Sequence, residues 1–100
     1  MKHIVIDLEM NGMAKEYRNT GLSCDREVIE IGAVVLDETY QEIGSFKTLV
    51  KPQYNNVIEK RITKLTGITT EMVLESPNFE AALREFFQWC QELSDEIQLY

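Results

Sequence analysis

A short apolar run near the N-terminus contains two carboxylates at alternate positions. Residues 4–10 read IVIDLEM, and their aliphatic, β-branched composition predicts a strand that is covered on both faces. Successive side chains of a strand point to opposite faces, so Asp7 and Glu9 would lie side by side, about 6.5–7 Å apart at their Cα atoms. The two expected faces are Ile4, Ile6 and Leu8 on one side and Val5, Asp7 and Glu9 on the other.

Two carboxylates at that separation can both reach one or two hard cations, and they repel each other when nothing positive lies between them. A buried strand does not tolerate such a pair without a partner. The local pattern also fits a second interpretation, in which Asp7 and Glu9 lie at a frayed, solvated strand end and have no function. The pattern alone does not separate a metal site from a solvated strand end.

Length and charge limit what can be built around this strand. The chain has 100 residues, of which 44% are hydrophobic, so we expect one domain spanning residues 1–100. The formal net charge of −7 argues against a general basic surface for nucleic acid or membrane, so any contact with a polyanion must be local or assisted by a metal. With no long apolar segment or signal-peptide pattern, and with Cys24 and Cys90 expected as free thiols, the chain is expected to be soluble and cytoplasmic.

The segments that follow alternate between loop and strand signals. Residues Asn11–Asp25 form a long polar connection in which Lys15 and Arg18 could touch a phosphate, although a solvated excursion is the favoured interpretation. Glu27–Asp37 is predicted as the second strand, and Ser45–Lys51 as a third strand antiparallel to it. On the second strand we expect Val28, Gly32, Val34 and Leu36 on one face and Ile29, Ile31, Ala33 and Val35 on the other. Glu30 interrupts this apolar strand, and a structural role is favoured over a place in an active site.

Helical spacing begins after Pro52. Val57–Leu65 is predicted as a helix that ends at Gly67, and Thr69 or Thr70 can cap a short turn that runs to Leu74. A broad apolar stripe predicts an amphipathic helix over Pro77–Leu93 that packs on the sheet, with Ser76 as N-cap and Asn78 as a rival cap. The last residues, Ile97–Tyr100, are predicted as a fourth strand that the crossover helix returns parallel to the first.

Four segments in this order resemble a known family. IVIDLEMNG, REVIEIGAVVLD, FKTLVKP and ITKLTGITTEMV are similar to the N-terminal half of the DEDDh 3′–5′ exonucleases, the proofreading-exonuclease and ERI-1-like group. The resemblance covers Ile4 to Tyr100. It implies an α/β, ribonuclease-H-like mixed sheet with antiparallel strands one to three, the crossover helix and the start of a parallel strand four.

The resemblance also implies chemistry. Members of this family cleave the terminal phosphodiester bond of DNA or RNA at a single-stranded 3′ end, with two Mg²⁺ or Mn²⁺ ions. Asp7 and Glu9 match the first two metal-binding acids. Met10 and Asn11 match positions that touch the terminal nucleotide, and Leu65 and Thr66 match positions that hold the terminal base; packing or capping is an equally weighted alternative for these four.

The family's third acid, general-base histidine and fourth acid have no counterpart here. The one histidine, His3, is expected to be a solvated residue at the start of the first strand. We therefore expect the first part of an exonuclease domain, inactive alone. The alternative is a non-catalytic interaction module with a vestigial metal site. In either case the unpaired sheet edge could support self-association.

Overall fold

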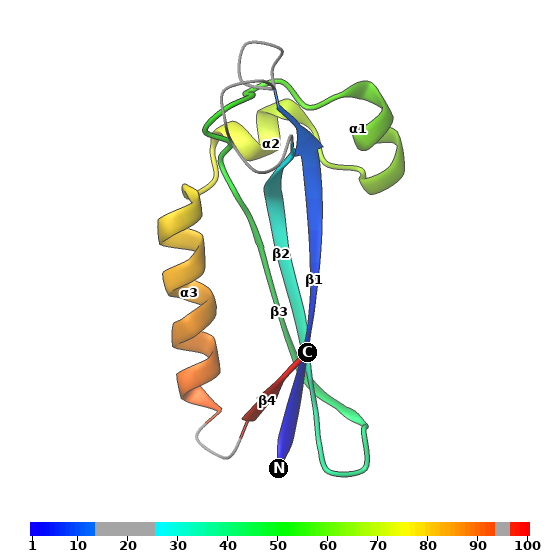
Figure 1. Ribbon diagram of the computed structural model, residues 1–100, viewed down its shortest axis with the longest axis vertical. Helices are drawn as coiled ribbons and strands as arrows, with labels where there is room; N and C mark the ends of the chain where they lie inside the picture. The colour runs from blue at the N-terminus through cyan, green and yellow to red at the C-terminus, as the bar shows by residue number, and fades with distance from the viewer. Residues whose placement is uncertain (14–25, 94–96) are drawn as a thin grey trace.

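The computed structural model describes residues 1–13, 26–93 and 97–100, and these form one mixed sheet with helices beside it (Figure 1). The order along the chain is β1 (Lys2–Gly12), β2 (Arg26–Leu36), β3 (Glu42–Leu49), α1 (Lys60–Thr66), α2 (Thr70–Leu74), α3 (Phe79–Glu92) and β4 (Ile97–Leu99). In the sheet the order is β3-β2-β1-β4. Helices α1 and α2 lie at one end of the sheet, and the β2–β3 turn lies at the other.

The predicted strand pairing is confirmed. Strands β1, β2 and β3 are antiparallel neighbours, and β4 is parallel to β1, with Lys2 opposite Ile97 and Ile4 opposite Leu99. Beyond β4, the Ile6 amide donates to the Tyr100 carbonyl at 3.1 Å, so the chain ends beside the residue that precedes Asp7. The third strand begins and ends earlier than the predicted Ser45–Lys51.

The main core lies between the sheet and α3. Its buried members come from β1, from β2, from the residue that follows β3 and from α3, and they are Ile4, Ile31, Ala33, Val35, Val50, Ala82 and Phe86. Helix α3 begins at Phe79, and its N-cap is Asn78, whose side-chain oxygen accepts the Ala81 amide at 2.9 Å. The predicted start at Pro77 with a Ser76 cap is therefore wrong: the Ser76 hydroxyl donates to the Met72 carbonyl at the end of α2 instead.

A β-bulge changes which way two side chains of β2 point. Glu9 lies opposite Glu30 and Met10 lies opposite Val28, so Ile29 is an extra residue in β2. Val28 packs against the main core, whereas Ile29 is fully buried with α1 and α2. The predicted faces are therefore wrong at Val28 and Ile29, because a bulge shifts the alternation by one residue and re-aims a side chain.

The two short helices form a second cluster with that redirected side chain. Its buried members are Ile29, Ile58, Ile62, Ile68 and Val73. Gly67 ends α1 with a φ of 78°, as predicted, and Thr69 is the cap of α2. Helix α1 begins at Lys60 rather than at Val57, and residues 57–59 form the approach to it, with a bend at Val57. In this approach the Val57 and Ile58 amides donate to the side chains of Asn55 and Thr70.

Two expectations about β1 are also wrong. The strand is not covered on both faces, since Val5 and Leu8 are 40% and 45% exposed. His3 is buried, not solvated: its Nδ1 lies 3.1 Å from the Tyr100 hydroxyl and its ring packs against that of Tyr40.

Among the residues that the structure describes, no helix is long and apolar enough to cross a membrane.

Candidate active site

Asp7 and Glu9 project from the face of β1 that points away from α3. Their neighbours on the strand, Ile4 and Ile6, contribute to the core beneath α3, so the alternation of the strand directs the two acids to the other side. Asp7 is exposed and Glu9 is half-buried. The alternative of a frayed strand end does not hold, because both residues pair with β2 within the ladder, Asp7 with Gly32 and Glu9 with Glu30.

Glu30 adds a third carboxylate to this face. It lies directly opposite Glu9, and only 15% of its side chain is exposed. Burial raises the pKa of Glu30, the Lys47 ammonium at 4.0 Å lowers it, and the negative charges of Glu9 and Asp7 raise it further, so that the net direction is upward. Glu30 is thus electrostatically coupled to the two acids, and the sequence alone did not indicate this because the contact crosses strands.

The described residues contain no group of three or more acidic, histidine or cysteine side chains arranged to hold one metal ion. What they offer is a pair of carboxylates on an accessible strand face. Hard cations such as Mg²⁺ accept one or two protein carboxylates and keep water or phosphate in their remaining positions. The chemistry of Asp7 and Glu9 therefore fits such an ion, while a complete cage would need further ligands.

Asn11 is fully buried and has an internal partner for each end of its amide. Its Nδ2 donates to the Val57 carbonyl and its Oδ1 accepts the Glu59 amide, both at 3.0 Å. The Glu59 carboxylate in turn accepts the Gly12 amide. These bonds attach the approach to α1 to the end of β1, so the Asn11 side chain positions α1 rather than facing solvent.

The other three predicted contact residues lie in different surroundings. Leu65, on α1, is 77% exposed. The Thr66 hydroxyl donates to the Ile62 carbonyl and accepts the Ile68 amide, so it caps the end of α1. Met10 is half-buried on the α3 side of the sheet. Lys15 and Arg18 lie outside the described residues.

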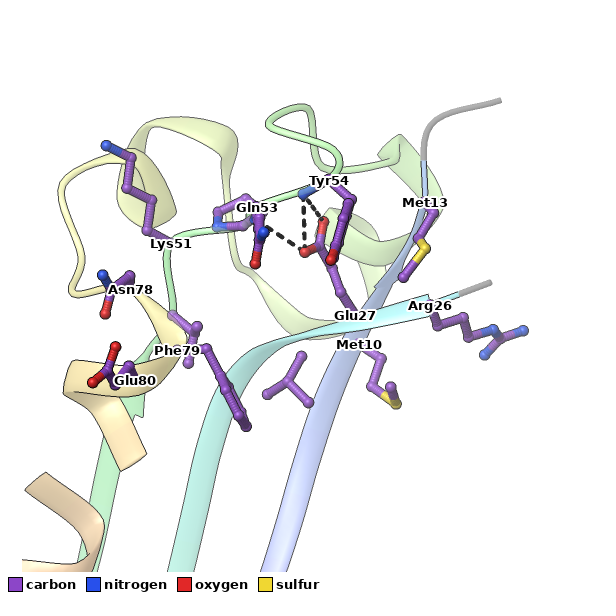
Figure 2. A pocket seen from close by; sticks show the side chains of 13 residues that line it. Met10, Met13, Arg26, Glu27, Lys51, Gln53, Tyr54, Asn78, Phe79 and Glu80 are labelled. Carbon is purple, nitrogen blue, oxygen red and sulfur yellow. Dashed lines mark hydrogen bonds between the residues drawn. The ribbon is translucent and has the colours of Figure 1, made fainter. Parts of the chain in front are cut away.

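Glu27 was not identified from the sequence, although it organises the same end of the sheet. Its carboxylate accepts the amides of three consecutive residues, Gln53, Tyr54 and Asn55, at 2.8–3.2 Å. Figure 2 shows the bonds from Gln53 and Tyr54. Asn55 then donates from its side chain to the Gly12 carbonyl. No local signal reveals this role, because the partners are 26 to 28 residues away.

A pocket of about 650 Å³ lies beside this network, between the end of β1, the start of β2, the segment after β3 and the start of α3 (Figure 2). Its lining includes Met10, Met13, Val28, Tyr54 and Phe79. Asp7 and Glu9 do not line it, and Met10 is the only predicted site residue that does. The pocket is therefore separate from the pair of carboxylates.

Comparison with known proteins places this geometry in context. The sequence matches the RNase_T family, described as exonuclease, over residues 4–98. It is 38% identical over 86 residues to DNA polymerase III subunit epsilon of Aquifex aeolicus, covering 86% of this chain and 37% of that protein. It is 33% identical over 94 residues to ERI1 exoribonuclease 2 of Danio rerio, covering 93% of this chain and 16% of that protein. The chain thus spans much less than half of the length of these relatives.

Solved structures give the same picture of the fold. The nuclease domain of 3′hExo, a DEDDh family member bound to rAMP, superposes with a TM-score of 0.78 at 25% identity, over 98% of this chain and 50% of that one. A full-length 3′-exonuclease superposes with a TM-score of 0.81 at 21% identity, over 98% of this chain and 33% of that one. The predicted α/β, ribonuclease-H-like fold is confirmed.

The buried amide of Asn11 generates the first prediction. Replacing Asn11 with Ala leaves the Val57 carbonyl and the Glu59 amide without their partners, so the free energy of unfolding should fall by about 2–4 kcal/mol. Urea unfolding followed by circular dichroism measures this. The matched control is Asn56→Ala, an exposed asparagine in the same segment, which should change stability by less than about 0.5 kcal/mol. Equal effects of the two changes would contradict the role given to Asn11.

The raised pKa of Glu30 generates the second prediction. In the folded state this carboxyl holds its proton above the ordinary value of 4.5, so its contribution to stability is favourable at low pH and is lost as the pH rises from 4.5 through the folded pKa. Glu30→Gln, which cannot ionise, should therefore raise Tm at pH 7 by a few degrees, and the gain should disappear near pH 4. Glu85→Gln, which removes an exposed charge from α3, is the control. A lower Tm for Glu30→Gln at pH 7 would refute the assignment.

Proposed function

This chain belongs to the RNase_T exonuclease family, and from that premise we propose that it carries the first part of a metal-dependent 3′–5′ exonuclease site. The observation that supports this most is the placement of Asp7 and Glu9 as adjacent, accessible carboxylates on one face of a paired internal strand. The parallel pairing of β4 with β1, which continues to a hydrogen bond between Tyr100 and Ile6, adds support, because the family's third acid follows the strand that here is β4.

In the proposed site, Asp7 and Glu9 hold Mg²⁺ or Mn²⁺. Two such ions would activate the attacking water and stabilise the departing 3′ oxygen when bound. The chain's own residues bind and orient the substrate: Leu65 presents an exposed apolar side chain for the terminal base, and Thr66 fixes the end of α1 behind it. Met10 borders the terminal nucleotide, and Asn11 contributes by holding the approach to α1 against β1. The substrate class is a single-stranded 3′ end of DNA or RNA.

The domain is proposed to be incomplete within residues 1–100, with the remaining acids and the general base supplied by further sequence. A second candidate function is supported by the position of β4, which lies at the edge of the described sheet beside β1, where an edge strand can pair with another chain. Leu8, Phe79 and Phe87, each about half-exposed, add apolar area that association would bury. In that case the chain is an interaction module, and concentration-dependent self-association without metal binding would be its signature.

Metal binding is the third prediction. Mn²⁺ added to the isotope-labelled chain should broaden the backbone amide signals of residues 7–9 first, because its only proposed ligands in this chain are the two carboxylates there. Asp7→Asn should abolish the effect, and Glu80→Gln, which removes an acid from α3, should leave it unchanged. Broadening centred on any other region would contradict the metal site.

Activity is the fourth prediction. Residues 1–100 alone should release no nucleotides from the 3′ end of single-stranded DNA or RNA in the presence of Mg²⁺ or Mn²⁺. A general base must come within hydrogen-bond reach of the attacking water, and the only histidine of the sequence, His3, is buried against Tyr40 and Tyr100. Gel analysis of labelled oligonucleotides tests this. Robust release that Asp7→Asn abolishes would show that the two acids need no further groups of the family's set.

A further inference from the structure

A row of three residues crosses the sheet on the face that carries the acids. Asp7 on β1 lies opposite Gly32 on β2, and Gly32 lies opposite Lys47 on β3. Residues in register across a sheet project to the same face, so Lys47 and Asp7 stand on that face two strand spacings apart, about 9.5–10 Å at their Cα atoms. Because the residue between them is glycine, no side chain of β2 separates them.

The fold does not require glycine at position 32. A Cβ atom placed there would meet the Asp7 carbonyl oxygen at 3.5 Å, an ordinary van der Waals contact, and Gly32 is not among the described residues with a positive φ. Neither backbone strain nor close packing therefore explains the missing side chain. What the glycine provides is open space between a proposed metal ligand and a cation.

Lys47 is suited to contact an anion in that space. Its side chain is 72% exposed, and its Nζ lies 4.0 Å from the Glu30 carboxylate, a loose ion pair near the limit of such contacts. Because the Lys47 end of the pair is exposed and the separation of 4.0 Å is long for an ion pair, the contact is weak, and the ammonium can exchange its partner at small cost. The ion pair with Glu30 holds the Lys47 ammonium on this face of the sheet, where an anionic ligand could replace Glu30 as its partner.

We infer that Lys47 is a phosphate-binding residue of this site, which contacts the phosphodiester backbone of the bound strand across Gly32. This inference rests on the proposed function and adds a binding residue to it. A strand that approaches Asp7, Glu9 and Glu30 meets three carboxylates on a chain of net charge −7. Bound divalent ions would neutralise the β1 side, and Lys47 supplies positive charge on the β3 side.

The experiment measures binding of a 5′-fluorescein-labelled octamer of deoxythymidine by fluorescence anisotropy in Mn²⁺, over a series of salt concentrations. Lys47→Ala should weaken binding about tenfold, the order expected for one lost hydrogen bond between charged groups. The slope of log K against log salt should become shallower by about 0.7, the value for one phosphate of a single strand. Lys47→Arg should retain the affinity. Arg84→Ala, which removes one positive charge from the exposed side of α3, should change neither quantity.

Two further variants test the open space itself. Gly32→Ala should fold and bind nearly as well as the wild type, whereas Gly32→Val should weaken octamer binding with Lys47 still present, provided that its Tm shows a folded chain. If Lys47→Ala and Arg84→Ala have equal effects, or if the salt slope is unchanged in Lys47→Ala, the inference is wrong.

Mn²⁺ binding to the same variants separates this inference from the proposed function. Lys47→Ala should bind Mn²⁺ as tightly as the wild type. A wild-type chain that binds no Mn²⁺ at Asp7 and Glu9 overturns the proposed function, and the role of Lys47 falls with it. A chain that binds Mn²⁺ there but does not bind the octamer overturns the role of Lys47 alone.

Discussion

The alternation of side chains along β1 is the constraint on which the rest of the structure depends. Ile4 and Ile6 point into the core beneath α3, and that burial forces Asp7 and Glu9 to the opposite face. A shift of one residue in the β1–β2 register would place both acids in the apolar core and both isoleucines in solvent. Apolar burial on one side of the strand thus fixes the accessible position of the carboxylates on the other.

The carboxylates of Asp7, Glu9 and Glu30 lie on one face of the sheet, and their mutual repulsion opposes folding. Glu9 and Glu30 are direct cross-strand partners, and like charges in that position are destabilising. Burial is the main cause of the raised pKa of Glu30, this repulsion adds to it, and Lys47 offsets only part of the rise. The remaining residues of this strand pair favour the fold. Destabilising residues retained in such a pair are typical of functional sites, where the side chains are needed for activity. Cations and a bound phosphate backbone would relieve the repulsion.

Local patterns predicted much of the fold. Period-two and helical spacing located the strands and helices, the crossover rule predicted that β4 is parallel to β1, and the glycine signal at Gly67 gave the end of α1. The bulge at Ile29 was not predictable, because Val28 and Ile29 are both apolar, so the residue types do not show which of the two faces the main core. The choice of Asn78 over Ser76 as the cap of α3 depended on Ser76 bonding to the end of α2.

The candidate site was predicted less completely than the fold, because residue types reveal chemistry but not partners. Asp7 and Glu9 could be identified from their spacing. The hydrogen bonds that hold the Asn11 side chain, however, come from residues 46 and 48 positions away. The role of Glu27 likewise depends on a distant segment, which begins with Gln53. The proximity of Glu30 and Lys47 to the acids follows from strand register, which the sequence specifies only through the assembled sheet.

Anomalous diffraction at the manganese absorption edge, from crystals of the chain grown with Mn²⁺, tests the central claim most directly. The account predicts an anomalous peak in direct contact with carboxylate oxygens of Asp7 or Glu9, on the face of the sheet opposite α3, and no such peak in Asp7→Asn crystals. Manganese bound only elsewhere on the molecule, with Asp7 and Glu9 solvated by water alone, would contradict it.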